Sequence, residues 1–274
     1  MTDLRPPNTT ADDPWSSAPV APPTAPPTAP PTSWPVPPPA VVDPRRWGMG
    51  DIFWGLGIVL LASTLLTLPV AVSGVATNGV WVTLLGALGT WIGFAGWPVY
   101  CSWVKGLGTL KADFGFRMEW YDLFLGVAAA VGALVVNVLL GVIEQQIDVR
   151  PETNTQILSD NANTGLGVLV VGAIAVLGAP IFEELFFRGL TFGAVEKRFN
   201  RWAAFVVSTV LFTLLHAQPA STWLGLGLML VHIGVLGVTF GLLRLVTGRL
   251  GPSIVAHMTV NGFATLVVLA TSIG

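Results

Sequence analysis

Long runs of apolar residues, separated by short polar segments, dominate the chain after its first fifty residues. A helix needs about 20 mainly apolar residues to cross about 30 Å of hydrocarbon, so each run predicts a membrane-spanning helix. Seven spans are expected, and they are listed here by number: 51-76, 80-104, 121-147, 166-192, 201-218, 222-246 and 251-271. The fifth is short, and the pattern also allows six or eight. The sequence predicts an all-α, polytopic membrane helical bundle.

Residues 1–47 follow a different pattern, with few aliphatic residues and many prolines. This segment contains 15 of the 21 prolines, including three consecutive Ala-Pro-Pro-Thr units from Ala21 to Thr32. Such a composition cannot build a core and is typical of a disordered or polyproline-II tail. A partner with an aromatic-lined groove could bind it, although a solvated tether is the favoured interpretation. We expect three parts: the tail (1–47), two helices with a basic loop (48–119) and a core (120–274).

Composition supports a membrane protein, since 53% of the residues are hydrophobic and only 10% are charged. A soluble domain has about 25% charged residues. The net charge of -2 and the scattered basic residues do not indicate nucleic-acid binding. Cys101 is the only cysteine, so the chain can form neither an internal disulfide nor a cysteine-based metal cluster.

The distribution of basic residues predicts the orientation, because cytoplasmic loops are enriched in Lys and Arg. With seven spans, all the basic residues except Arg150 and Arg188 lie on one side. Arg150 lies on the other side and Arg188 within the fourth span. We therefore expect a protein of the plasma membrane with a cytoplasmic N-terminus and an external C-terminus. Glycines spaced by four, such as Gly89 and Gly93, are expected to allow close helix packing.

The fourth expected span contains Glu183, Glu184 and Arg188. A charged residue at the centre of a spanning helix costs about 2.5 to 3.5 kcal/mol even on lenient scales, so such residues are rare and usually functional. Glu184 and Arg188 are four residues apart and can form an ion pair on one helix face, which is also compatible with a purely structural role. Glu183 points elsewhere, and the ion pair does not explain it. Pro180, just before the pair, either kinks the helix and admits water or merely shapes packing.

Histidines occur in the later spans. His216 ends the fifth span, and His257 lies four residues before Asn261, on the same helix face. His232, in the sixth span, lacks such polar neighbours and is interpreted as a packing or supporting residue. Counting about 1.5 Å per residue from the cytoplasmic boundary places Glu183 and His216 about 20 Å deep but His257 only about 10 Å deep. Helix tilt or a late start of the last helix would remove this mismatch.

These residue types allow two kinds of hydrolytic chemistry. A carboxylate and an imidazole can activate water, while an imidazole and a carboxamide can stabilise the oxyanion that forms on an amide carbonyl. Alternatively, two histidines with glutamates could hold zinc with an open position for water. The chain has no H-E-x-x-H sequence and no G-x-S-x-G elbow.

The chain resembles the family of CAAX proteases and bacteriocin-processing enzymes, also called the type II CAAX prenyl endopeptidase or Abi family. The family's E-E-x-x-x-R corresponds to Glu183 through Arg188, its F-x-x-x-H to Phe212 through His216, and its H-x-x-x-N to His257 through Asn261. The three motifs occur in the family's order, and the resemblance covers roughly residues 120 to 271.

The resemblance implies an intramembrane endopeptidase. Glu183 and His216 would activate the hydrolytic water, and His257 with Asn261 would stabilise the oxyanion. Glu184, Arg188 and Phe212 would position the site. No metal is assigned and a metal-independent glutamate mechanism is favoured; if a divalent metal such as zinc is required, Glu183, His216 and His257 are its expected ligands. The expected substrate is a peptide or a membrane protein.

Two other classes of function fit the same residues. A non-catalytic membrane scaffold could retain the motifs as a structural polar cluster. A proton-coupled transporter could use intramembrane Glu and His as a relay, although the spans show no inverted repeat. A scaffold should tolerate Glu183→Gln, whereas a protease should fold normally and lose activity.

Overall fold

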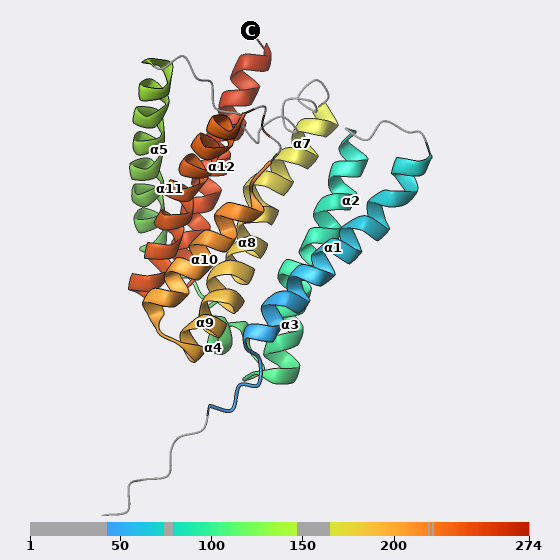
Figure 1. The fold of residues 1–274 in the computed structure, drawn as a ribbon, viewed down its shortest axis with the longest axis vertical. Coiled ribbons are helices and arrows are strands. Elements are labelled where there is room, and N and C mark those ends of the chain that lie inside the picture. Colours follow the sequence, from blue (N-terminus) through green and yellow to red (C-terminus); the bar gives the residue numbers. More distant parts are fainter. Residues whose placement is uncertain (1–42, 74–78, 147–164, 219, 221, 274) are drawn as a thin grey trace, which may run out of the picture. The chain divides into compact units, whose positions relative to one another are not determined.

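A computed structural model describes residues 43–73, 79–146, 165–218, 220 and 222–273. They belong to one compact unit that begins at Asp43. In this part of the chain every regular element is helical (Figure 1). The α-helices are α1 (Met49–Val72), α2 (Val80–Trp91), α3 (Trp97–Tyr100), α4 (Leu110–Phe114), α5 (Asp122–Gln146), α7 (Gly165–Ala173), α8 (Ala179–Glu184), α9 (Phe192–Arg198), α10 (Arg201–Leu215), α11 (Trp223–Thr247) and α12 (Gly251–Ile273). Four π-helical segments join some of them: η1 (Ile92–Gly96), η2 (Cys101–Lys105), η3 (Ile174–Gly178) and η4 (Leu185–Thr191).

The predicted polytopic helical bundle is confirmed. Six helical stretches of the described chain are long and apolar enough to cross a bilayer. They are Met49–Val72, Val80–Lys105, Asp122–Gln146, Gly167–Arg198, Trp223–Thr247 and Gly251–Thr271. These stretches correspond to six of the seven expected spans. The protein is therefore a multi-pass membrane protein.

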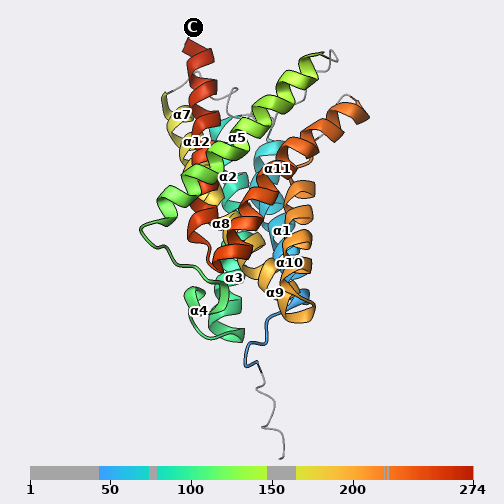
Figure 2. The ribbon, with the colours of Figure 1, turned by 90° about the vertical axis from the view of Figure 1, so that its left-hand side faces the viewer.

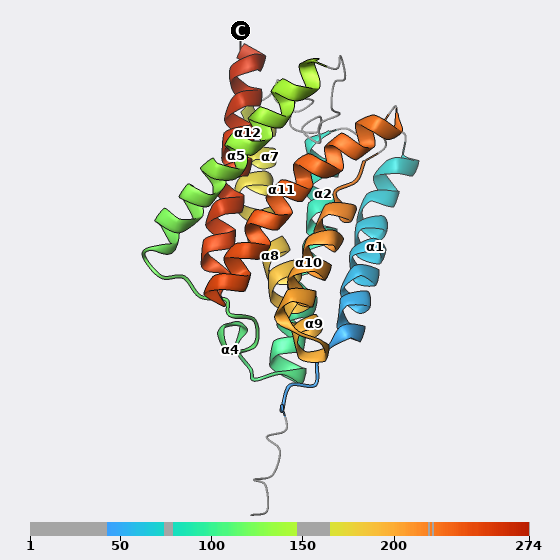
Figure 3. The same ribbon diagram turned by 60° about the vertical axis from the view of Figure 1, so that its left-hand side comes forward.

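The fifth expected span is shorter than the pattern suggested. The apolar helix there, α10, has 15 residues and ends at Leu215. At 1.5 Å per residue it is about 22 Å long, less than the hydrocarbon thickness of about 30 Å. Figure 3 shows α10 and α11 running in opposite directions, so α10 still alternates in direction with its neighbours. His216 directly follows the end of α10, and its side chain is partly buried.

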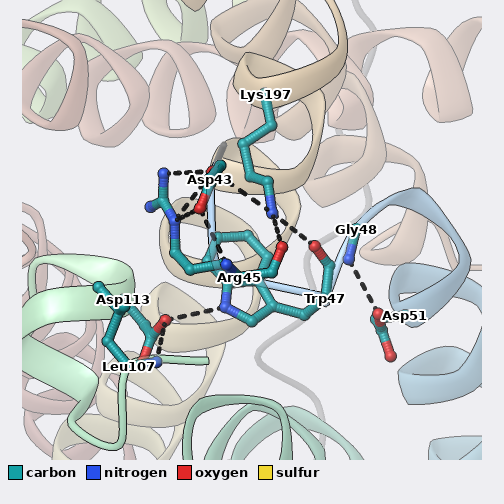
Figure 4. A network of polar contacts seen from close by, with 8 residues as sticks. All are labelled: Asp43, Arg45, Trp47, Gly48, Asp51, Leu107, Asp113 and Lys197. Carbon is teal, nitrogen blue, oxygen red and sulfur yellow. Dashed lines mark hydrogen bonds and ion pairs between the residues drawn. The ribbon is translucent and has the colours of Figure 1, made fainter. Parts of the chain in front are cut away.

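Residues just before α1, which the sequence analysis assigned to the tail, contact the bundle. Trp47 is only 1% exposed, and its indole Nε1 donates a hydrogen bond of 2.9 Å to Asp113 Oδ1 (Figure 4). The Arg46 backbone N–H donates to the Lys105 carbonyl at 2.6 Å. The proline-rich repeats of the expected tail lie outside the described residues.

Glycines bring neighbouring helices close together, as their spacing predicted. A Cβ at Gly89 would lie 2.5 Å from the Ser63 backbone, and one at Gly93 would lie 2.6 Å from the Gly55 carbonyl oxygen. Both contacts join α1 to the second span. Because lipid gives apolar helices no hydrophobic reason to associate, close backbone packing of this kind stabilises the pair.

The fourth span is one continuous helix with two π-helical segments. It runs through α7, η3, α8, η4 and α9, and its apolar stretch Gly167–Arg198 has 32 residues. Such a helix is about 48 Å long and cannot lie wholly within the hydrocarbon. The two π-helical segments flank Glu183 and Glu184. Such wide turns inside α-helices are frequent at functional sites.

The N-terminal helices pack directly on this fourth span. A Cβ at Gly178 would lie 2.2 Å from the Trp91 ring, and one at Gly55 would lie 2.4 Å from the Phe186 ring. Phe94 stacks on Phe186 with ring centroids 4.6 Å apart. The core of the described bundle is therefore shared between the first two spans and the helix that carries the glutamates.

A buried ion pair fixes the start of the last helix. Arg249, in the turn between α11 and α12, donates from Nε to both carboxylate oxygens of Asp122 at 2.9 Å. Asp122 is the first residue of α5, and Figure 2 shows α5 crossing in front of α12. Because this carboxylate accepts hydrogen bonds from the guanidinium, the pKa of Arg249 is raised above its ordinary value.

Candidate active site

Two histidine side chains converge on one carboxylate oxygen of Glu183. Glu183 Oε2, on α8, lies 3.4 Å from Nε2 of His216 at the end of α10 and 3.9 Å from Nε2 of His257 on α12. That oxygen is buried and has no hydrogen-bond partner among the described residues. The His216 side chain is 24% exposed, the Glu183 side chain 15% and that of His257 6%. The site is therefore enclosed but open on the side of His216.

The other nitrogen of each ring is already used, and this determines where the proton sits. His216 Nδ1 lies 2.8 Å from the Phe212 carbonyl oxygen, and His257 Nδ1 lies 3.1 Å from Glu184 Oε1. A carbonyl or carboxylate oxygen can only accept, so both Nδ1 atoms carry hydrogen. In a neutral ring, Nε2 then presents a lone pair. In an imidazolium ring, Nε2 is a donor instead, so the protonation state of each ring decides whether its Nε2 accepts or donates beside Glu183.

Glu184 and Arg188 form the expected ion pair, with Arg188 Nη1 3.0 Å from Glu184 Oε1. Both side chains are fully buried. Arg188 Nη2 also donates to the Gly237 carbonyl at 2.9 Å, which joins the fourth span to α11. Since Glu184 Oε1 also binds His257, the pair orients this histidine. Glu183, one residue earlier, faces His216 instead, as the 100° rotation between neighbouring helix residues requires.

Two phenylalanines clamp the polar groups. The Arg188 guanidinium lies 4.3 Å from the centroid of the Phe212 ring, a cation–π distance. His216 lies 4.3 Å from the same ring, between centroids. Phe240, on α11, stacks on His257 at 4.6 Å with 21° between the ring planes. Sequence reasoning missed Phe240, because one phenylalanine in an apolar span gives no signal.

Asn261 is held by a backbone group that Pro180 leaves free. In η3 the Ala179 N–H donates to the Ile174 carbonyl, five residues back. The next bond of this type would join residue 180 to the Ala175 carbonyl, but proline has no N–H. Asn261 Nδ2 donates to that carbonyl at 2.7 Å instead. One hydrogen of the amide is thus anchored, and the second is available for another acceptor.

The expected depth mismatch does not occur, since His257 and Glu183 meet directly. Figure 3 shows the C-terminal end of α9 extending beyond the first turn of α12, so the fourth span ends and α12 begins at different levels. Residue counts from a common boundary therefore overestimated the depth of Glu183 relative to His257. α12 starts at Gly251, the same residue as the expected span, so a later helix start does not account for the agreement.

His232 belongs to a second polar cluster that includes neither Glu183 nor His216. Its Nδ1 lies 2.7 Å from Asn137 Oδ1 and its Nε2 lies 2.9 Å from Glu144 Oε1, both on α5. Glu144 is buried. The cluster links α5 to α11. The sequence offered a clue in Asn137 and Glu144, two polar residues seven apart on one face of the third span.

The metal alternative can be compared with the geometry of the three residues that it requires. Glu183, His216 and His257 are the right residue types for zinc. Within the described ranges, however, no group of three or more His, Cys, Asp or Glu side chains is arranged as a metal ligand set. As they stand, the residues do not fit an ion, so no reaction step is derived through one below.

Comparison with known proteins gives two partial matches. Residues 165–263 match the family model for "Type II CAAX prenyl endopeptidase Rce1-like". A 120-residue stretch is 31% identical to "Putative membrane peptidase YdiL" of Bacillus subtilis (strain 168). That stretch is 44% of this chain and 45% of the relative, so the match spans about half the length of that relative. No solved structure matches.

The chain is thus a membrane protein whose segment 165–263 is similar to the type II CAAX prenyl endopeptidase Rce1-like family. The matched segment contains all the residues of the three motifs, from Glu183 to Asn261. It ends before the C-terminus of α12 and excludes α1 to α5.

Proposed function

We propose that this protein is an intramembrane endopeptidase of the CAAX type, which hydrolyses peptide bonds with a water activated by Glu183 and His216. The observation that carries the proposal is the convergence of two histidine Nε2 atoms on an unpartnered, buried Glu183 oxygen, at 3.4 and 3.9 Å. A buried acceptor without a donor is costly unless water or a reacting group occupies the space beside it.

In the first step, a water molecule between Glu183 and His216 loses a proton to the carboxylate, with the His216 Nε2 lone pair as its second acceptor. The water oxygen attacks the carbonyl carbon of the peptide, and the carbonyl π electrons move to its oxygen. Phe212 holds His216 in the required tautomer through its backbone carbonyl. Proton transfer by a positioned side chain typically contributes a factor of about 10² to 10⁴.

His257 and Asn261 stabilise the resulting oxyanion. Asn261 supplies the amide hydrogen that the Ala175 carbonyl does not use. His257 donates from Nε2 as an imidazolium, whose charge the Glu184 carboxylate balances through Nδ1. Donors of this kind typically contribute a factor of about 10² to 10³ each.

Collapse of the tetrahedral intermediate completes the reaction. The electron pair on the oxyanion re-forms the carbonyl, the C–N bond breaks, and the proton taken up by Glu183 passes to the leaving amine. The products are a new carboxyl terminus and a new amino terminus, and the carboxylate is restored. No redox partner is needed, and the proposal uses no metal.

The site's position within the bundle suggests that its substrates are peptides or membrane proteins whose cleaved bond reaches the membrane interior. The family name adds CAAX sequences as one such class. We further propose a plasma-membrane location with a cytoplasmic N-terminus, on the basis of the Lys and Arg distribution.

The test is cleavage of a quenched peptide library by the purified protein in detergent. Wild type is compared with Glu183→Gln, each with and without phenanthroline. Glu144→Gln is the matched control, because it removes another buried intramembrane carboxylate that also contacts a histidine. We expect Glu183→Gln to keep its melting temperature and lose at least about 10³-fold in kcat.

Each outcome of the cleavage experiment supports or contradicts one interpretation. Wild-type cleavage that survives the chelator supports the metal-independent mechanism, whereas loss under chelation assigns the reaction to a bound metal. Cleavage that persists in Glu183→Gln contradicts the catalytic assignment. A well-folded wild type that cleaves no peptide favours the scaffold alternative.

A further inference from the structure

A cationic pocket lies at the end of the bundle where α1 begins, away from the glutamate and histidine site. It has a volume of about 430 Å³ and is lined by the α4 region, the turn after α11 and Arg45. Its charged lining residues are Arg45, Lys111, Asp113, Arg117 and Arg244. Four cations and one carboxylate thus share one cavity.

The acidic residue of this pocket does not neutralise the cations. Asp113 is buried, and its oxygens accept hydrogen bonds from Trp47 Nε1, from Ser102 Oγ at 2.8 Å and from the Leu107 N–H. Figure 4 shows the carboxylate turned toward Trp47 and Leu107. Its hydrogen-bonding capacity is therefore used on neutral donors.

Among the described residues, Arg45 is the one cation of the set that forms an ion pair. Asp43 accepts from its Nε at 2.8 Å and from its Nη2 at 2.8 Å (Figure 4). This bidentate contact holds the pKa of Asp43 below its ordinary range and raises the pKa of Arg45. The charges of Lys111, Arg117 and Arg244 remain uncompensated by any ion pair among the described residues.

Arg244 is buried and has no ion pair among the described residues, although Glu196 attracts it at longer range and its guanidinium carbon lies 5.4 Å from the centroid of the Phe192 ring. It is only 7% exposed, and its Nε has no hydrogen-bond partner among the described residues. Its Nη1 donates to the Gly248 carbonyl, which carries no full charge. Burying a guanidinium without a counter-ion is costly, and a planar guanidinium matches the oxygen spacing of a phosphate.

The surroundings of this pocket have the composition of a membrane interface. Arg117 also lines a neighbouring cavity of about 340 Å³ whose other lining residues carry no charge. Trp120, 78% exposed, and Tyr121 follow closely in sequence, and exposed Trp and Tyr are typical of the membrane interface. A ligand with a phosphate in one cavity and hydrocarbon in the other would fit both.

We propose that Lys111, Arg117 and Arg244 form a binding site for a phosphate group, supplied by the headgroup of an anionic phospholipid. Clustered basic residues beside spanning helices attract anionic lipids electrostatically, and the buried guanidinium adds a specific contact. The site is independent of the proposed peptidase reaction.

The test is the thermal unfolding midpoint of the purified full chain in detergent, titrated with phosphatidylglycerol, phosphatidylcholine or inorganic phosphate. A ligand that binds the folded state raises the midpoint with concentration, which gives a dissociation constant. Lys111→Gln/Arg117→Gln is the test variant, because both side chains are exposed and the protein should still fold. Arg198→Gln is the control, since it removes an exposed cation of α9 outside the pocket.

Saturable stabilisation by phosphatidylglycerol, weakened at least about tenfold in the double variant but not in Arg198→Gln, would support the lipid site. The same pattern with inorganic phosphate alone would support the site with free phosphate as its ligand. The proposal is overturned if phosphatidylglycerol and phosphatidylcholine act equally, if the double variant binds like wild type, or if no probe shows saturation.

Discussion

Two histidine and glutamate clusters lie inside this bundle, and they differ in how many histidine ring nitrogens have a hydrogen-bond partner. His232 has a partner on both ring nitrogens, Asn137 and Glu144, at 2.7 and 2.9 Å. His216 and His257 are each tied through Nδ1 alone, which leaves Nε2 facing Glu183. The presence of paired Glu and His in a membrane helix therefore does not define a catalytic site.

The difference lies in the unused lone pairs. A ring with both nitrogens engaged can join helices but has no free position from which to move a proton to or from water. A ring held by one nitrogen is oriented and still reactive, which is the arrangement that general acid–base catalysis requires. Polar groups in a membrane span are thus best sorted by their remaining hydrogen-bonding capacity.

Replacement of each histidine by glutamine gives the largest contrast. His216→Gln removes the ring nitrogen beside Glu183, and we expect kcat to fall about 10² to 10⁴-fold. His232→Gln should leave kcat nearly unchanged, because its ring touches neither Glu183 nor the motif residues. Initial rates on one cleaved peptide, at matched melting temperature, would measure this. Equal losses in the two variants would contradict the comparison.

A smaller effect is expected from Pro180→Ala. The new N–H can bond the Ala175 carbonyl five residues back and compete with Asn261 Nδ2. Asn261 would lose its anchor, and we expect kcat to fall severalfold with little change in KM. Pro69→Ala is the control, because Pro69 lies inside α1 and away from the site. An unchanged kcat in Pro180→Ala would show that the backbone carbonyl does not position the amide.

The smallest effect concerns stability alone. In a double-mutant cycle of Glu144→Leu and His232→Leu, we expect each single change to destabilise the protein and the pair to recover part of the loss. Couplings of this kind in membrane proteins average about 0.6 kcal/mol, with a maximum near 1.7. Reversible unfolding in mixed micelles would measure it. A zero coupling energy would mean that the second cluster does not join α5 to α11.

Much of the fold could be read from the sequence, because apolar run length alone determines where a helix can span. The motif spacings also predicted correctly which residues share a face, as for Glu184 with Arg188 and His257 with Asn261. The sequence does not reveal that Trp47 is buried, since its partner Asp113 lies 66 residues away. Contacts of that range depend on packing.

The site shows the same division. Glu183, His216 and His257 lie together, and Asn261 lies on the same helix as His257. The kinetic tests above address the role of each residue. The π-helical turns, the Ala175 carbonyl and the stacking of Phe240 on His257 were not predicted. Each arises from how one helix is wound against another, and a single sequence carries no local signal for that geometry.

The close approach of Gly178 to Trp91, with no room for even a methyl group, has a consequence for protein engineering. The matched family segment begins at residue 165, whereas the surface that supports it begins near α1. The segment that matches the family is therefore shorter than the part of the chain that packs together. In a chimera that joins residues 165–263 to foreign N-terminal helices, those helices would need a side chain that packs against Gly178 as Trp91 does. Without it, the helix that carries the glutamates would be displaced.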